Sequence, residues 1–210
     1  MGLWVTRLCD IYVRQQDIPL DRSLLSTLES SVNAKARLLH YFPKPNDTLD
    51  SEDDGVDDWC GEHVDHGSLT ALLPGMISDE ESSLQSDRES IPGILPPGLY
   101  IRTRNGETVH AKLSPTSLGF QVGETMSIQS RGRLQATPHF VKASPGTSRE
   151  SLALFLQPDA DEILPPLEMK SDGECSVRGD DESPSDPFEL ASRWRPTFGE
   201  FQRETIAYYN

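Results

Sequence analysis

The sequence has few cysteines and no apolar run long enough to cross a bilayer. Its three cysteines, Cys9, Cys60 and Cys175, are an odd number without the spacing of a CxxC motif. An odd set cannot pair completely within one chain, so we expect reduced thiols and a cytoplasmic setting. We expect no association with a membrane.

Basic residues are also scarce. The 210 residues include 19 Lys and Arg against 34 Asp and Glu, which gives a formal net charge of −15. The acids are concentrated in three segments that hold seven, five and ten of them, residues 46–58, 79–93 and 159–187. The rest of the chain is mildly positive. Nucleic-acid binding needs clustered Lys and Arg, so this composition argues against a nucleic-acid partner.

Many short apolar segments separated by turn residues predict a mainly β chain with a few helices. Trp4, Leu8, Ile11 and Tyr12 have helical spacing and predict a helix that packs through these residues. Asn105 and Gly106 form a strong hairpin signal. Predicted helices cover residues 1–15 and 23–32, and predicted strands cover 36–43, 69–76, 99–103, 108–113, 120–122, 126–129, 136–142 and 151–157. This pattern is typical of a sandwich, a barrel or a jelly roll.

The domain organisation follows from these patterns. Thr197 and Glu200 have the spacing of a capping box, which marks the start of a last helix. We expect one domain at residues 1–158, with helices in 1–34, a β core in 35–158 and acidic loops at 46–58 and 78–98, followed by a disordered acidic segment at 159–193 and a helix in 194–210.

Two small groups of residues have the composition of binding sites. His63 and Asp65 are two residues apart, so on a strand they point to the same side. With His139, in a later predicted strand, they make the two-histidine, one-carboxylate set that holds non-haem Fe(II). Arg149 and Ser151 are also two residues apart. A guanidinium beside a hydroxyl makes a receptor for a carboxylate.

Two neighbours of the predicted metal site compete for the same role. His66 follows Asp65 directly and faces the other way on a regular strand, so we assign it a supporting role. Cys60 lies close to His63 in sequence, but thiolate metal sites normally use several cysteines. We interpret Cys60 as a free thiol beside the strand.

The motifs HVD, QATPH and RES occur in this order, with DHGSLTALL, GLYIRTRNGETVHAKL and TFGEF as supporting stretches. Together they resemble the Fe(II)- and 2-oxoglutarate-dependent oxygenases of the isopenicillin N synthase-like family. The resemblance implies a double-stranded β-helix, or jelly roll, with Fe(II) held by His63, Asp65 and His139. It also implies that Arg149 and Ser151 bind the far carboxylate of 2-oxoglutarate.

The implied activity is a dioxygenase that uses O2 to oxidise a small organic substrate and releases succinate and CO2, with ascorbate as a reductant. The chain departs from the family at two points. Phe42 stands where many relatives have a tyrosine that contacts the co-substrate, and its lost hydrogen bond predicts an affinity lower by about ten- to hundredfold. A preceding region of relatives is missing, so we expect an N-terminally truncated chain.

Two alternative functions stay open. One is an iron oxidase of the same fold that does not use 2-oxoglutarate. Arg149 and Ser151 argue against it only moderately, since the resemblance extends to oxidases that keep a similar pair for the substrate's own carboxylate. The other is a truncated, non-catalytic homologue that acts as a binding module.

Overall fold

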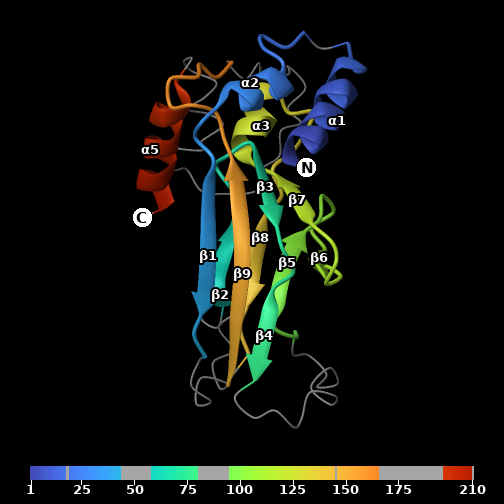
Figure 1. Cartoon of the computed structure of the whole chain (residues 1–210), viewed down its shortest axis with the longest axis vertical. Helices are drawn as coiled ribbons and strands as arrows, with labels where there is room; N and C mark the ends of the chain where they lie inside the picture. The colour runs from blue at the N-terminus through green and yellow to red at the C-terminus, as the bar shows by residue number, and fades with distance from the viewer. Residues whose placement is uncertain (18, 44–57, 80–94, 145, 166–195, 210) are drawn as a thin grey trace.

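The structure, a computed structural model, describes residues 1–17, 19–43, 58–79, 95–144, 146–165 and 196–209. Two antiparallel sheets form its body, and the helices gather at one end of them (Figure 1). Most of both predicted acidic loops and most of the predicted disordered segment at 159–193 lie outside the described residues. Within the described parts of the chain, no helix combines the length and apolarity needed to cross a membrane.

Each sheet is built from strands that are distant in sequence. The five-stranded sheet has the order β1 (Lys35–Tyr41), β9 (Thr147–Leu156), β3 (Leu69–Leu72) and β7 (Gly119–Val122), and β4 (Met76–Asp79) also pairs with β9. The four-stranded sheet has the order β2 (Asp58–His63), β8 (His139–Lys142), β5 (Gly98–Arg102) and β6 (Thr108–His110). The predicted mainly β jelly-roll class is confirmed.

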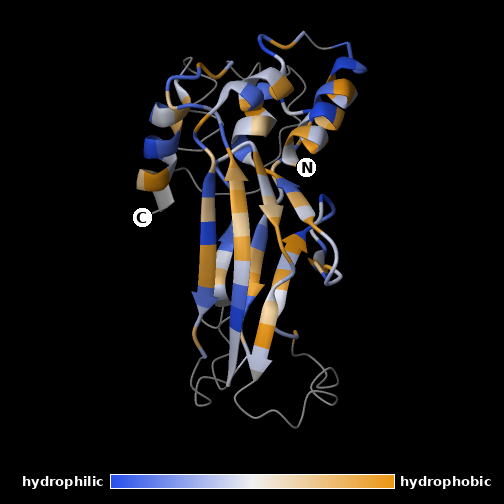
Figure 2. Ribbon diagram, in the orientation of Figure 1, coloured by the Kyte–Doolittle hydropathy of each residue, from blue (hydrophilic) through white to orange (hydrophobic). Residues whose placement is uncertain are grey.

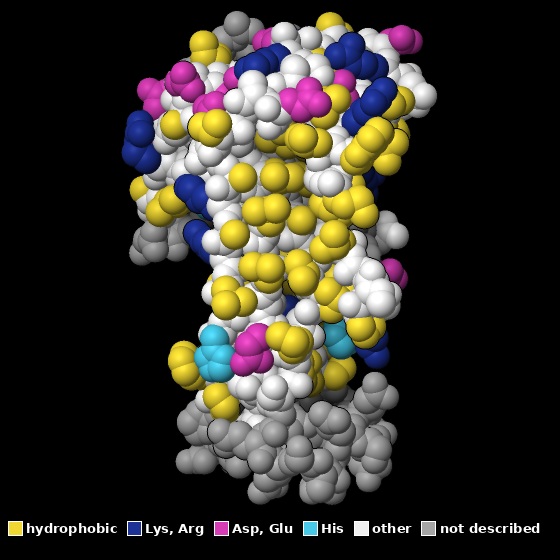
Figure 3. Space-filling view, viewed as in Figure 1, with side chains coloured by type: hydrophobic (Ala, Val, Ile, Leu, Met, Phe, Trp, Pro, Cys, Tyr) yellow, Lys and Arg dark blue, Asp and Glu magenta, His cyan; other side chains and the backbone are white. Residues whose placement is uncertain are grey.

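Strand β9 places polar side chains inside the molecule and apolar ones outside. Arg149 and Ser151 are buried, at 7% exposure each, whereas the alternate residues Leu152 and Leu154 are exposed at 36% and 39%. The alternation is visible as coloured bands along β9 (Figure 2). Apolar side chains cover the outer face of this sheet in the space-filling view (Figure 3). The interior of the tube is therefore equipped for polar chemistry.

The main hydrophobic cluster lies where α1 (Gly2–Arg14), α2 (Leu24–Ser30) and α3 (Glu124–Gln129) meet the end of the five-stranded sheet. Ser23, one of the two residues that could mark the start of the predicted helix, caps α2, because its side chain accepts a hydrogen bond from the Ser26 N–H. The buried members of the cluster are Val13, Leu24, Leu28, Leu69 and Met126.

A second cluster attaches α5 (Phe198–Tyr209) to the domain. The predicted capping box is present, with Thr197 Oγ1 accepting from the Glu200 N–H and the Glu200 carboxylate accepting from the Thr197 N–H. Leu164 is fully buried in this cluster with Ile128, Phe198 and Phe201. Leu164, beyond the predicted end of the domain at residue 158, therefore takes part in the core.

Three predicted elements differ in the structure. Residues 126–129 belong to helix α3 and not to a strand. All six residues of α3 are buried, so the alternation of apolar and polar residues that predicted a strand does not separate a buried face from an exposed one. The predicted strand 69–76 is split at Pro74 and Gly75 into β3 and β4. Helix α1 packs through Val5, Cys9 and Val13 and leaves Trp4 and Leu8, both at 66%, exposed.

Candidate metal centre

His63 and His139 face each other across one ladder of the four-stranded sheet. His63 is the last residue of β2, His139 is the first of β8, and they are directly paired in the register. Their ring centroids are 4.2 Å apart. Asp65 lies two residues beyond β2, in the connection to β3, so the prediction that it shares a regular strand with His63 is wrong.

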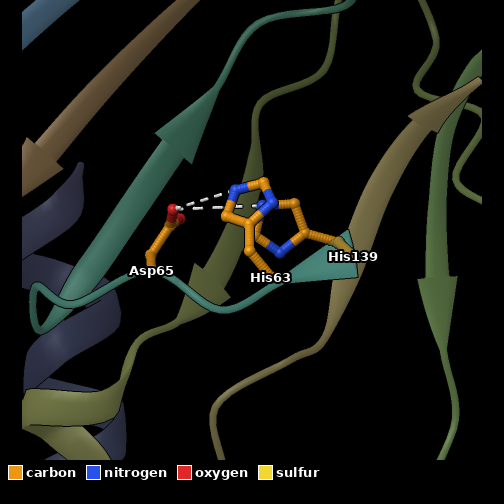
Figure 4. A group of neighbouring side chains, drawn as sticks. All are labelled: His63, Asp65 and His139. Carbon is orange, nitrogen blue, oxygen red and sulfur yellow. Dashed lines mark ion pairs between the residues drawn. The ribbon is translucent and has the colours of Figure 1, made fainter. Parts of the chain in front are cut away.

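The ligand atoms of these three residues converge (Figure 4). Asp65 Oδ1 lies 4.0 Å from His63 Nε2 and 3.9 Å from His139 Nε2, and all three ligand atoms are within 4.8 Å of one another. Two atoms that bind one ion at about 2.1 Å lie roughly 3.0–3.4 Å apart. Small side-chain rotations therefore bring all three groups to metal-binding distance.

Both imidazoles are held in the tautomer that suits a metal ligand. The Nδ1–H of His63 donates to the Gly61 carbonyl at 2.8 Å, and that of His139 donates to the Thr137 carbonyl at 2.9 Å. A carbonyl oxygen only accepts, so in the neutral form of each ring the proton is on Nδ1 and the Nε2 lone pair faces the other prospective ligands. The donor set thus fits a divalent ion.

The carboxylate of Asp65 uses its two oxygens differently. Oδ2 accepts a hydrogen bond from Thr70 Oγ1 at 2.6 Å and another from Gln121 Nε2 at 2.5 Å. Oδ1 is the oxygen that faces both histidines. Thr70 and Gln121 were not predicted from the sequence. Their only signal was an inward position on a predicted strand, which many residues share.

The electrostatics of the two histidines differ. The Cys60 thiol, whose Sγ is 3.6 Å from His63 Nδ1, raises the pKa of His63 to about 9, with smaller contributions from the Gly61 carbonyl and Asp65 and with burial opposing. Burial lowers the pKa of His139, with Asp65 opposing. His139 is therefore neutral at pH 7, whereas His63 must lose a proton before it binds an ion.

Arg149 and Ser151, the two residues predicted to bind a carboxylate, lie together on the facing sheet. Arg149 Nη1 donates to Ser151 Oγ at 3.1 Å, and both side chains point into the tube. Burial lowers the pKa of Arg149, and Tyr41 opposes that shift. Gly75 permits this placement, since a Cβ there would lie 2.6 Å from Arg149 Nε. Arg149 also lines a cavity of about 460 Å³.

Tyr41, and not Phe42, is the aromatic residue beside Arg149. Tyr41 is directly paired with Arg149 across β1 and β9, and the guanidinium carbon lies 5.4 Å from the Tyr41 ring centroid. Phe42 points away and is 74% exposed. The expectation that Phe42 removes a hydroxyl from the receptor is therefore corrected. The register of β1 against β9 decided this, and sequence spacing did not reveal it.

Neither predicted competitor joins the metal centre. His66 Nδ1 lies 2.8 Å from an oxygen of Glu124, which is buried at the start of α3, and it is outside the group of ligand atoms. The Cys60 sulfur approaches the Nδ1 side of His63 and not its metal-facing nitrogen.

No protein-family model matches the chain. A feruloyl CoA ortho-hydroxylase of Ipomoea batatas is 30% identical over 155 residues, which are 72% of this chain and 36% of that protein. Feruloyl CoA ortho-hydroxylase 2 of Arabidopsis thaliana is 31% identical over 163 residues, 76% of this chain and 38% of that protein. The chain thus spans little more than a third of the length of these relatives.

Solved structures share the fold. The structure of JOX2 in complex with 2OG, Fe and JA has a TM-score of 0.56 at 21% identity, over 80% of this chain and 41% of that one. The rice dioxygenase for auxin oxidation has a TM-score of 0.55 at 18% identity, over 98% of this chain and 55% of that one.

Two facing antiparallel sheets with two histidines and one carboxylate converging between them define a double-stranded β-helix with a candidate metal centre. By sequence the chain is similar to plant oxygenases that use Fe(II) and 2-oxoglutarate, the resemblance that its motifs predicted.

Proposed function

We propose that the chain carries the catalytic core of a non-haem Fe(II), 2-oxoglutarate-dependent dioxygenase that oxidises a small organic substrate and releases succinate and CO2. The observation that carries the proposal is the convergence of two Nε2 atoms and Asp65 Oδ1, with both histidine tautomers fixed by backbone carbonyls. Fe(II) prefers this ligand set and keeps open positions in it.

His63, Asp65 and His139 would hold the ion from one side. The iron and its co-substrate supply the oxidation chemistry when bound. The chain supplies placement, since the two histidines come from paired positions of one sheet and Asp65 is tied to the other sheet by Thr70 and Gln121. The buried position of His139 and Asp65, at 7% and 10% side-chain exposure, limits competition from water.

Arg149 and Ser151 would receive the far carboxylate of 2-oxoglutarate, with Tyr41 as a third group. A guanidinium fork matches a carboxylate in shape and stays charged. The mutual support of Arg149 and Ser151 within the tube fixes the fork before the co-substrate arrives. The Tyr41 hydroxyl supplies the role that Phe42 was expected to leave empty.

The partners in this proposal are O2 and a small organic molecule, and nucleic acid and membrane are not among them, in line with the acidic charge. A cytoplasmic setting is supported by the free thiols of Cys9 and Cys60. We assign the chemistry to the domain at residues 1–158.

The test combines metal binding with turnover. The protein is titrated with Fe(II) without oxygen, then supplied with 2-oxoglutarate, O2 and ascorbate while succinate is measured. Succinate formation that His139→Ala abolishes supports the proposal. Iron binding without any succinate favours the same-fold oxidase. Absence of iron binding favours the non-catalytic binding module, an alternative kept because the chain spans only about a third of the length of its relatives.

A further inference from the structure

The carboxylate of Asp65 is held by a pair of residues on the sheet opposite the histidines. Thr70 of β3 and Gln121 of β7 are direct partners in the register of the five-stranded sheet, and both side chains point into the tube. Thr70 is 2% and Gln121 is 8% exposed. Neither belongs to the group of prospective metal ligands.

Both residues donate to the same oxygen. Thr70 Oγ1 lies 2.6 Å and Gln121 Nε2 lies 2.5 Å from Asp65 Oδ2. The amide of Gln121 must present its NH2 group here, because its carbonyl oxygen would face a carboxylate oxygen with no proton between them. Two charge-assisted donors satisfy Oδ2 and leave Oδ1 as the oxygen that faces the histidines.

Gln121 also contacts a second prospective ligand. Its Nε2 lies 3.1 Å from His139 Nε2 and 3.4 Å from His139 Nδ1. Near-equal distances to both ring nitrogens place the amide over the face of the imidazole and not in its plane. The Nε2 lone pair, which lies in the ring plane, therefore stays available to an ion.

Asp65 needs this support more than the histidines do. The histidines lie at paired ends of two hydrogen-bonded strands, whereas Asp65 is in an irregular connection. A carboxylate on such a segment has two equivalent oxygens and free rotation about its terminal bond. Without the two donors, nothing in the described contacts of the carboxylate distinguishes Oδ1 from Oδ2.

We infer that Thr70 and Gln121 are positioning residues that make Asp65 a ligand through Oδ1 alone. The inference rests on the proposed function. Its chemical consequence is that Asp65 occupies one coordination position and leaves another free for co-substrate or oxygen. Binding through both carboxylate oxygens would fill that position. The pair thus controls the number of open positions as well as the affinity for the ion.

The test uses the full chain and Mn(II) as a probe of metal affinity and of bound water. Thr70→Val and Gln121→Leu remove the donors with little change in volume. We expect each to weaken Mn(II) binding about 10–100-fold, as loss of a group that orients a metal ligand does. In the double variant, Asp65 is free to bind through both oxygens, so water-proton relaxation at saturating Mn(II) falls by about a third, as one of about three waters is lost.

Matched controls exclude a general loss of packing. Thr27 and Gln129 have the same exposed fractions as Thr70 and Gln121, 2% and 8%, and their side chains bond to Ser23 and Ser68 and not to the Asp65 carboxylate. Thr27→Val and Gln129→Leu should leave both readouts unchanged, and Thr70→Ser, which keeps the hydroxyl, should restore binding relative to Thr70→Val.

The outcomes separate this inference from the proposed function. If the unaltered chain binds Mn(II) and the Thr70 and Gln121 variants bind it equally well with the same water relaxation, the inference is wrong and the metal centre stands. If the unaltered chain binds neither Mn(II) nor Fe(II), the proposed function fails and the inference with it.

Discussion

At the scale of single residues, the two histidines of the candidate metal centre differ in protonation: one is neutral and the other holds a proton. His139 is buried, and burial lowers its pKa. The Cys60 thiol is the main cause that raises the pKa of His63 to about 9. Metal affinity should therefore depend on pH through His63 and not through His139.

Below pH 9, a divalent ion must displace the His63 proton, so the apparent affinity for Co(II) should rise about tenfold per pH unit and level off near pH 9. Cys60→Ala should lower the pKa of His63 and move the plateau to lower pH. Titrations between pH 6 and pH 9 measure both. An affinity that is constant above pH 7 in the unaltered chain would contradict this prediction.

The raised pKa of His63 also makes the stability of the metal-free protein depend on pH. A pKa raised from 6.5 to about 9 on folding stabilises the folded state fully below pH 6.5, and the contribution is lost as the pH rises through 9. The proton on His63 therefore stabilises the folded protein at the low-pH end of this range, whereas metal binding is strongest at the high-pH end.

Tyr41 and Phe42 give a direct test of the carboxylate receptor. Tyr41→Phe removes a hydroxyl beside Arg149 and should weaken 2-oxoglutarate binding about ten- to hundredfold, the value of one hydrogen bond to a charged group. Phe42→Tyr adds a hydroxyl on an exposed side chain and should change nothing. Calorimetry with the metal-loaded protein measures both affinities, and the reverse result would place Phe42 in the receptor.

At the scale of elements, the connection that carries Asp65 is held against the start of α3. The Glu124 N–H donates to the Asp65 carbonyl at 2.8 Å, and the Gly123 N–H donates to the Ser68 carbonyl at 3.1 Å. A Cβ on Gly123 would overlap the Gly67 carbonyl and lie 2.7 Å from the Asp65 carbonyl oxygen. The position of α3 therefore determines the position of the carboxylate ligand.

Gly123→Ala should force these segments apart and lower the free energy of unfolding by about 1–3 kcal/mol. It should also weaken metal binding, because the backbone of Asp65 moves with the connection. Gly61→Ala is the control, since a Cβ there meets nothing within 4 Å. Urea unfolding with a metal titration checks both effects. Equal free energies of unfolding for the two variants would contradict this prediction, because they would show that the connection moves at little cost to accept the added Cβ.

At the scale of the whole molecule, no single sheet contains the candidate site. The two histidines come from the four-stranded sheet, and Thr70, Gln121 and Arg149 come from the five-stranded sheet. The outer face of the five-stranded sheet carries exposed apolar side chains, with Leu38 at 81% and Met76 at 65% exposure (Figure 3). Because the candidate site takes side chains from both sheets, its geometry depends on how the two sheets pack against each other.

The segment beyond residue 158 contributes to the core through Leu164, which is fully buried in the cluster that holds α5. Leu164→Ala should lower the free energy of unfolding by about 2–5 kcal/mol, the cost of a large cavity. Ile163→Ala, one residue away and 62% exposed, should change it by less than about 0.5 kcal/mol. Thermal unfolding of the two variants decides whether α5 and Leu164 belong to the cooperative unit.

Much of the fold could be predicted from local patterns. The Asn105–Gly106 hairpin and the Thr197–Glu200 box depend on neighbouring residues, and both are present. Residues 126–129 were predicted wrongly as a strand, because apolar and polar residues alternate there. In α3 all six residues are buried, so this alternation does not mark one buried face. The exposed face of α1 was also predicted wrongly, because this helix has two apolar stripes and its sequence does not rank them.

The sequence by itself indicated the family resemblance, the order of the motifs and the five residues of the predicted sites, because residue types and their spacing carry that information. The tertiary structure alone decided that Asp65 leaves the strand, that Tyr41 replaces Phe42 beside Arg149, and that Thr70 and Gln121 share one carboxylate oxygen. Each of these depends on the register between strands far apart in the chain. Register is fixed by packing of the whole domain, which local spacing does not encode.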